Sequence, residues 1–253
     1  SEIMLSSIEE TMVGLRQFGS GQKGLISIGL LSSVARNLLP AASEKLSEKF
    51  PEIELDILEI APKEAIDLLY GRQLSVAVLA EDSIAKSILS FSKTNLFEDP
   101  YVLAVPKSVS LENIKSLEDL KSSPVRKALS NIIQFEFGNQ HKKRIEEWFT
   151  SVLPNSKVFA KTRTYEVALS MVQSGRGVAV IPALAARLSG NLDFDVNLYR
   201  TNLPVRKIVS LIPSQYIRVE PYKSFIKALS DSGKNIELPK IHKVPPILES
   251  LSL

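Results

Sequence analysis

The sequence predicts an α/β protein made of two consecutive halves. Short apolar segments with the character of strands alternate with helical segments over most of the chain, and the alternation starts afresh near Tyr101. Segment 74–79 (LSVAVL) is almost entirely apolar, as expected of a parallel strand that is covered on both faces. Strands separated by helices are joined by crossover connections and form largely parallel sheets, so each half is expected to contain such a sheet.

The first half contains three expected strands and two expected helices. The strands lie at 25–30, 53–57 and 74–79. Pro40 fits best in the first turn of the helix that runs to Phe50, because a proline there loses no helical hydrogen bond, and this places the N-cap near Asn37. Pro62 opens the second helix and Gly71 closes it.

The second half repeats this alternation. Its strands are expected at 102–105, 132–137, 158–162, 178–181 and 207–212. Thr164 is a candidate N-cap for a helix that ends at Gly175. The other expected helices are a short one within 108–123, one that follows Gly138 and runs through Phe149, and one at 222–229.

The two halves are expected to form lobes that the chain connects twice. No Gly/Ser/Pro-rich linker separates them, and extended stretches near 96–104 and 199–208 lie where the chain would cross. We assign 24–100 with 203–232 to lobe I and 101–202 to lobe II. Ligands of open α/β sheets bind beyond the carboxyl ends of the strands, at helix N-termini, so two such lobes would enclose a cleft.

Both ends of the chain differ from this pattern. Residues 1–20 carry Leu5, Ile8, Met12 and Leu15 at a/d heptad spacing, which fits a dimerising helix or an amphipathic helix that lies on its own domain. Residues 233–253 are interrupted by prolines and are expected to form an extended tail.

Composition excludes several kinds of chemistry. The 253 residues include 31 Lys and Arg against 28 Asp and Glu, and a formal charge of +3 neither requires nor excludes nucleic acid. The absence of cysteine excludes disulfides and thiolate metal sites, and the two histidines share no local signature with a nucleophile. We therefore expect no enzyme activity, no metal and no cofactor. No apolar run is long enough to span a membrane, and the acidic first residues do not fit a secretory signal.

An ordered set of motifs resembles one known family. The motifs are Gly24–Gly29 (GLISIG), Leu38–Pro40, Phe50-Pro51, Leu68–Gly71, Gly138 with Arg144 and Trp148-Phe149, and Met171–Pro182 (MVQSGRGVAVIP). In this order they resemble the effector-binding domain of LysR-type transcriptional regulators, from about residue 24 to residue 230. The resemblance implies two Rossmann-like lobes joined by two crossover strands, like the type 2 periplasmic binding proteins, with a small-molecule effector in the cleft.

The same resemblance implies partners and a location. Residues 1–20 would be the end of the linker helix that dimerises the regulator, and a DNA-binding winged helix-turn-helix would precede Ser1. The protein would be a homodimer or homotetramer in the bacterial cytoplasm, with no membrane partner. In the family's antiparallel pairing, helix 37–50 of one chain would face helix 139–152 of its partner.

Three departures from the family pattern matter for the expected chemistry. The strand after Gly71 reads LSVAV, where many members carry an aspartate, and Glu81-Asp82 lies where several relatives place a basic residue that holds an effector carboxylate. The peroxide-sensing branch requires cysteine and is excluded. The tail from Gly233 runs beyond the usual end of the domain.

The candidate effector-binding residues follow the ends of strands in both lobes. They are Ser32, Ser33, Glu81, Phe137, Asn139, Thr162, Thr164 and Tyr165. Hydroxyl groups and backbone N–H groups at a helix N-terminus suit an anionic or polar ligand, although Ser32 and Ser33 also fit simple capping. Phe137 fits either stacking on an effector or a place in the core.

Charged residues leave further alternatives open. Glu81-Asp82 suits an ammonium or guanidinium group, and hence an effector with a cationic group such as an amino-acid-like metabolite, but it also fits solvated loop charge. Lys142–Arg144 is followed by Glu146-Glu147, so helical pairing makes it a solvated face rather than a phosphate site.

The sequence thus supports an effector-sensing, oligomerising domain of a transcriptional regulator. A free two-lobed solute-binding protein of a transport system is the alternative; it would need export, and the heptad at residues 5–15 favours the regulator. A small-molecule enzyme on the same fold lacks a visible catalytic set. The sequence does not identify the effector or the promoter. It also does not distinguish activation from repression, or a dimer from a tetramer.

Overall fold

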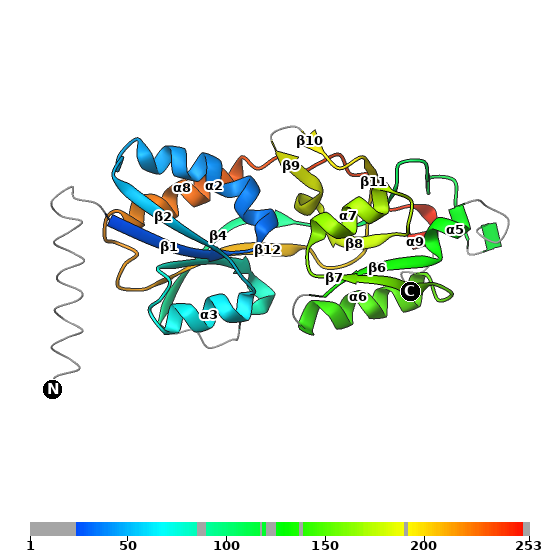
Figure 1. Cartoon of the computed structure of the whole chain (residues 1–253), viewed down its shortest axis with the longest axis horizontal. Coiled ribbons are helices and arrows are strands. Elements are labelled where there is room, and N and C mark those ends of the chain that lie inside the picture. Colours follow the sequence, from blue (N-terminus) through cyan, green and yellow to red (C-terminus); the bar gives the residue numbers. More distant parts are fainter. Residues whose placement is uncertain are drawn as a thin grey trace. The chain divides into compact units, whose positions relative to one another are not determined.

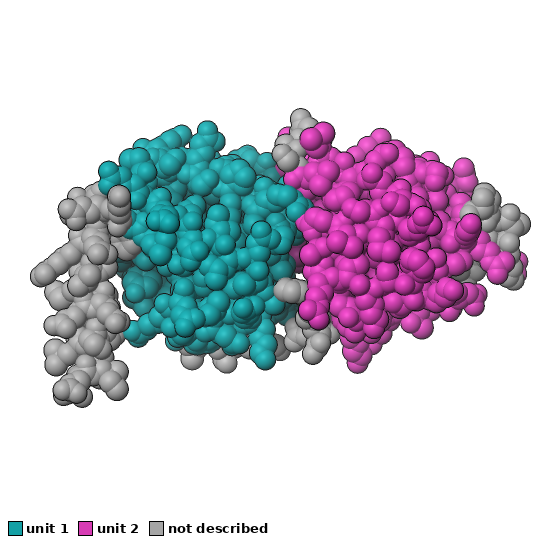
Figure 2. Space-filling view, in the orientation of Figure 1, with its two compact units in different colours: residues 1–97, 208–236 teal, residues 98–207, 237–253 magenta. Residues whose placement is uncertain are grey.

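The chain divides into two compact units. The computed structural model describes residues 24–84, 90–116, 118–119, 125–136, 139–189 and 192–249, so the predicted linker helix at 1–20 lies outside the described residues. Unit 1 comprises the chain up to Phe97 and Ile208–Ile236, and unit 2 comprises Glu98–Lys207 and Glu237–Leu253 (Figure 2). From Glu237 onward, the segment that was expected to form an extended tail groups with unit 2.

Unit 1 is built on one five-stranded sheet in the order β2-β1-β3-β12-β4 (Figure 1). Its strands are β1 (Gly24–Leu30), β2 (Ile53–Glu59), β3 (Val76–Ala80), β4 (Phe91–Asp99) and β12 (Arg206–Pro213). β1 pairs in parallel with both β2 and β3, whereas β12 pairs antiparallel to β3. Two of the three boundaries between the units fall inside β4 and β12, so these two strands carry the chain between the units, as predicted. The third boundary lies between Ile236 and Glu237 and was not predicted.

Helices cover both faces of this sheet. Helices α2 (Ser32–Ser47) and α8 (Tyr222–Lys234) pack on one face, and the core there includes Phe225, Ile28 and Val78. Helix α3 (Pro62–Tyr70) packs on the other face, where Leu69 and Leu79 are buried. Since β3 contributes Val78 to one core and Leu79 to the other, its continuous apolar run is explained by burial on both faces.

The predicted start of the first long helix is wrong. We expected an N-cap near Asn37, but α2 begins at Ser32, so that Pro40 lies inside the helix. The residues before Pro40 that face the core, Val34 and Leu38, are fully buried, whereas the Pro40 ring is exposed to solvent. Packing of that apolar face stabilises the extra turns against the missing hydrogen bond at proline.

Unit 2 contains two small sheets and a short β-ladder. One sheet has the order β11-β5-β8, and the other pairs β6 with β7 in parallel. The bounds are β5 (Tyr101–Pro106), β6 (Asn131–Phe135), β7 (Lys157–Thr162), β8 (Ala179–Pro182), β9 (Arg187–Ser189), β10 (Leu192–Asp193) and β11 (Val196–Arg200). A single bridge between Ile132 and Val178 links β6 to the end of β8. β9 and β10 form the ladder.

Two long helices cover unit 2. Helices α6 (Asn139–Val152) and α7 (Tyr165–Gln173) appear in Figure 1 on opposite sides of the β6–β8 strands. Trp148 and Phe149 of α6 are buried in one apolar cluster, and Ala168 and Leu169 of α7 in another. The short elements are η1 (Glu81–Ser83), α5 (Val125–Leu129), η2 (Ala183–Ala186) and α9 (Pro246–Glu249). The helix expected within 108–123 lies partly outside the described residues.

The Ser-Gly-Arg-Gly turn after α7 depends on two glycines for different reasons. Gly175 has a φ of +72°, in the left-handed region that glycine adopts without strain. A Cβ at Gly177 would lie 2.5 Å from the carbonyl oxygen of Asn131, so no side chain fits there. This turn therefore ends α7 and allows the chain to approach β6 closely, which agrees with the predicted helix-terminating turn.

Candidate functional site

The parallel strands of unit 1 bring predicted site residues to one end of its sheet. β1, β2 and β3 run in the same direction, so their carboxyl ends lie at the same edge. Ser32 and Ser33 follow β1 at the beginning of α2, and Glu81 follows β3 directly. The topology thus supports a shared location for these three residues.

Ser33 has an unusual environment in this group. Its side chain is only 1% exposed, and its Oγ makes no hydrogen bond with any part of the chain that the structure describes. Capping does not explain it, because Leu31 is the N-cap of α2 and no side chain caps that terminus. Burial of a hydroxyl without a partner is costly, so simple turn formation does not account for the position of Ser33. Ser32 lies beside it, partly exposed.

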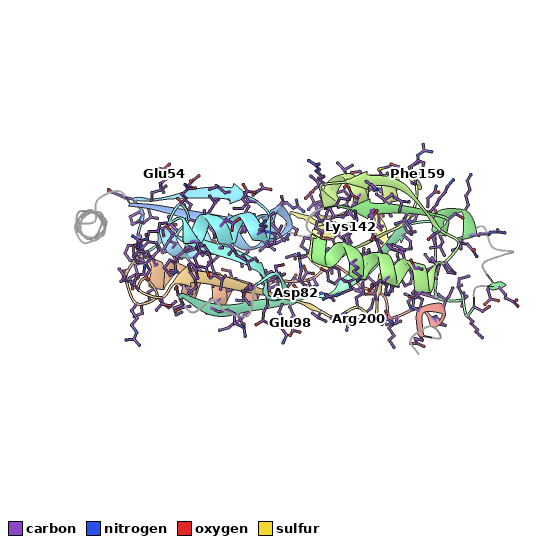
Figure 3. All side chains as sticks on the ribbon, turned by 90° about the horizontal axis from the view of Figure 1, so that it is seen from below. Glu54, Asp82, Glu98, Lys142, Phe159 and Arg200 are labelled. Atoms are coloured by element: carbon purple, nitrogen blue, oxygen red, sulfur yellow. The ribbon has the colours of Figure 1, made fainter. Side chains whose placement is uncertain are left out.

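Glu81 already has a cationic partner within its own unit. Lys93 of β4 forms an ion pair and hydrogen bond with the Glu81 carboxylate, and both side chains are partly exposed. Asp82 is exposed to solvent (Figure 3). A ligand amine at Glu81 would therefore compete with the Lys93 ammonium group.

Unit 2 brings a second group of predicted residues together. β6 and β7 are parallel and end at Phe135 and Thr162, respectively. Thr164 is the N-cap of α7, as predicted, and its Oγ1 accepts a hydrogen bond from the Val167 amide at 3.4 Å. Thr162 is buried, and its hydroxyl donates to the Thr164 carbonyl at 2.6 Å.

An aromatic pair lies at the same end of unit 2. The rings of Tyr165 and Phe135 are stacked, with centroids 3.9 Å apart and an interplanar angle of 18°. Burial raises the pKa of the Tyr165 hydroxyl, so it stays a neutral hydrogen-bonding group. Predicted residue Phe137 and the side chain of Asn139 lie outside what the structure describes. Phe135, two residues earlier, is the aromatic residue that the sequence reasoning missed.

A charged network surrounds the beginning of α6. Glu136 accepts a hydrogen bond from Lys142 at 2.8 Å and lies 3.2 Å from Lys161 (Figure 3 labels Lys142). The hydrogen bond from Lys142 holds the pKa of the Glu136 carboxyl below its usual value, and the same bond raises the pKa of Lys142. Lys142 therefore does more than pair along its helix with Glu146, which lies 4.0 Å away.

A buried ion pair lies near the points where the chain passes between the units. The Arg206 Nη2 atom is 2.6 Å from the Asp99 carboxylate, and the two side chains are 3% and 0% exposed. Asp99 also accepts a hydrogen bond from the Leu184 amide at 3.0 Å. The sequence offered no signal for this pair, since its members are 107 residues apart in the chain.

The described residues contain neither a cluster of metal-binding side chains nor a helix that could span a membrane. Within them, no group of three or more His, Asp or Glu side chains is placed to hold a metal ion. In the same part of the chain, no helix is both long and apolar enough to cross a membrane.

The fold defines the class of this protein. Two α/β units, between which β4 and β12 carry the chain, have the type 2 periplasmic-binding-protein-like architecture. Residues 19–233 match the LysR substrate binding domain family, and the chain belongs to that family. The family membership predicted from the motifs is thereby confirmed.

The individual relatives have low sequence identity to this chain, and each is named as a transcriptional regulator. The chain is 22% identical to a probable RuBisCO transcriptional regulator of Phaeodactylum tricornutum, covering 88% of this chain and 71% of that protein. It is 23% identical to the DNA-binding transcriptional dual regulator OxyR of Escherichia coli, covering 85% and 67%. For AlsR of Bacillus subtilis the identity is 24%, and the alignment covers 68% of this chain and 55% of that regulator.

Solved structures support the fold. The reduced form of OxyR from N. meningitidis superimposes with a TM-score of 0.61 at 21% identity, covering 83% of this chain and 96% of that one. The effector binding domain of QuiR in complex with shikimate gives a TM-score of 0.61 at 17% identity, covering 86% and 100%. The named relatives are transcriptional regulators rather than transport proteins or enzymes.

Proposed function

We propose that this chain is the effector-sensing and oligomerisation domain of a bacterial, cytoplasmic LysR-type transcriptional regulator. A small metabolite binds to it, and the binding changes the geometry of a DNA-binding winged helix-turn-helix on the same polypeptide. Coupling of this kind is typically about 1–3 kcal/mol, which is enough to change promoter occupancy. The observation that carries the proposal is family membership over residues 19–233, together with polar groups gathered at the strand ends of both units.

We propose that the effector contacts the strand ends of each unit. The residues are Ser32, Ser33 and Glu81 in unit 1, and Phe137, Asn139, Thr162, Thr164 and Tyr165 in unit 2, with Phe135 added from the structure. The buried, unpartnered Ser33 hydroxyl supports a polar or anionic group at the beginning of α2. Glu81 and Lys93 together offer one charge of each sign, which suits an amino-acid-like effector.

The first test is a thermal-shift screen with a panel of small carboxylic acids and amino acids. A ligand present at 100 times its dissociation constant stabilises a protein by about 2.7 kcal/mol. For any ligand found, Ser33→Ala should weaken binding about fivefold, since one hydrogen bond is worth about 1 kcal/mol. The same substitution should leave the unfolding free energy unchanged or higher, because the hydroxyl has no hydrogen-bond partner among the residues that the structure describes.

A matched control separates binding from folding. Ser47 lies on the same helix, is exposed, and donates to the Glu44 carbonyl at 2.8 Å; Ser47→Ala should leave the affinity unchanged. Glu81→Gln should weaken the binding of ligands that carry an amine, as measured by calorimetry, and should leave the affinity for other ligands unchanged. Unchanged affinity in both Ser33→Ala and Glu81→Gln would remove the unit 1 residues from the proposed site.

We propose further that the chain forms a homodimer through two complementary surfaces. Edge strand β2 exposes three acidic side chains, at Glu54, Asp56 and Glu59, and a fourth, Glu52, directly precedes it (Figure 3 labels Glu54). Strand β7 exposes Lys157 and Lys161 together with two apolar side chains, Val158 and Phe159 (labelled in Figure 3). Opposite charge on the two strands favours pairing of β2 in one protomer with β7 in its partner.

Apolar grooves lie beside both strands. One groove of about 390 Å³ lies between α2 and β2 and is lined by Leu39, Pro40 and Ile57. The other, of about 310 Å³, lies between α6 and β7 and is lined by Phe149, Pro154 and Val158. In an antiparallel dimer, both grooves of each chain would be covered by the partner chain. This agrees with the helix pairing that the family resemblance implies.

A charge-swap experiment tests the dimer. Glu54→Lys and Lys157→Glu should each raise the dimer dissociation constant by about tenfold, since like charges then meet across the interface. The double variant should regain most of the affinity, as measured by sedimentation velocity at low ionic strength. The control Lys127→Glu, on exposed α5, should have no effect. Equal weakening without rescue would contradict the pairing of β2 with β7.

A further inference from the structure

The segment after α8 is not a loose tail. Residues 237–249 follow unit 2 along most of their length and contribute partly buried Leu238 and Ile241 to one apolar cluster of that unit. They then contribute Ile247 and Leu248, each 2% exposed, to another cluster. This segment lies beyond residue 233, where the family match ends, so family membership does not account for it.

The middle of the segment adds a backbone bridge to an edge strand. β11 lies at the end of the order β11-β5-β8, so one side of it has no strand neighbour within that sheet. On this side the His242 amide donates to the Leu198 carbonyl at 2.8 Å, and the Arg200 amide donates to the His242 carbonyl at 3.0 Å. The segment therefore satisfies edge groups that a sheet otherwise leaves open to another strand.

Side chains hold this bridge in place. The His242 ring stacks on Tyr199 of β11, with centroids 5.0 Å apart and an interplanar angle of 28°. Its Nδ1 lies 3.1 Å from a Glu112 carboxylate oxygen. Tyr199 is itself buried, and its hydroxyl accepts a hydrogen bond from the Leu111 amide at 3.0 Å. Beyond the bridge, the Ile247 amide donates to the Ile114 carbonyl at 2.9 Å.

We propose that residues 237–249 form an edge strap. The strap closes the β11 edge of unit 2 with the chain's own backbone and thereby prevents a second copy of the chain from adding a strand there. β2 and β7, by contrast, carry exposed charges and apolar side chains suited to a partner, so the strap directs self-association away from β11. This proposal is independent of the effector and does not require the proposed regulator function.

The test uses the 253-residue protein and hydrogen exchange. In the wild-type protein, the Arg200 amide should exchange at least about tenfold more slowly than an unprotected amide, since a lost backbone hydrogen bond is worth about one factor of ten. His242→Pro removes the donor to Leu198 and should raise the Arg200 exchange rate about tenfold, while amides in β1 and β3 keep their rates. Sedimentation velocity should then show additional, concentration-dependent association.

Two further variants define the result. His242→Ala keeps both backbone bonds but loses the contacts with Tyr199 and Glu112, so Arg200 exchange should rise by about threefold. Lys243→Ala, at an exposed neighbouring position, should change nothing. Fast Arg200 exchange in the wild-type protein overturns the strap even if His242→Pro does not fold. If His242→Pro raises the exchange rate of the Arg200 amide but does not increase self-association, the edge strap does not prevent strand addition at β11.

Discussion

Replacement of Arg206 by leucine should destabilise unit 2 by about 3–5 kcal/mol, because it leaves the Asp99 carboxylate buried without its counter-ion. Both side chains are almost fully buried, and their closest atoms are 2.6 Å apart. Asp99 would keep the hydrogen bond from the Leu184 amide, but a neutral donor does not replace a guanidinium group for a buried charge.

The single tryptophan gives a direct measurement of this effect. Trp148 is buried in unit 2, where its Nε1 donates to Asn202 at 2.7 Å, so its fluorescence reports the unfolding of that unit in urea. Asp99→Asn combined with Arg206→Leu should recover part of the loss, because the buried charge is then absent. Lys143→Leu is the matched control in the same unit: it breaks an exposed ion pair with Glu147 on α6 and should cost less than about 0.5 kcal/mol. A cost below about 1 kcal/mol for Arg206→Leu would contradict a buried pair.

The second large effect is expected in the core of unit 1. Phe225 of α8 is fully buried among residues of α2 and the sheet, so Phe225→Ala should cost about 3–5 kcal/mol through lost apolar burial and the cavity left behind. Urea unfolding followed by far-ultraviolet circular dichroism measures the change.

An exposed apolar residue is the control for this prediction. Leu192 is 68% exposed, and Leu192→Ala should change the unfolding free energy by less than about 0.5 kcal/mol. If Phe225→Ala also cost less than about 1 kcal/mol, α8 would not pack on the sheet of unit 1 as described.

Local sequence signals identified many of the elements correctly. Pro62 at the start of α3 and Thr164 at the N-cap of α7 act through the residues next to them, so their effect is visible in a short window. The end of α3 shows the limit of such signals. Gly71 closes α3 as predicted, but its φ is −73°, and the next residue, Arg72, takes the positive φ of 58°.

The candidate site was only partly accessible from the sequence. The order of strands and helices places Ser33 and Thr164 at strand ends without knowledge of any contact. The stacking of Phe135 on Tyr165 and the pairing of Glu81 with Lys93 depend on how separate strands are placed side by side. Phe135 is partly exposed at the end of a strand, and a strand-terminal aromatic gives no sign in the sequence of what it faces.

By itself, the sequence determined the family and the alternation of strands and helices, since both are written in short motifs and in the spacing of apolar residues. Only the tertiary structure decided that α2 extends through Pro40, that Asp99 meets Arg206, and that the chain after Glu237 lies along β11. The physical reason is that burial and long-range pairing depend on the surface of the neighbouring element. Local propensity gives no information about that surface.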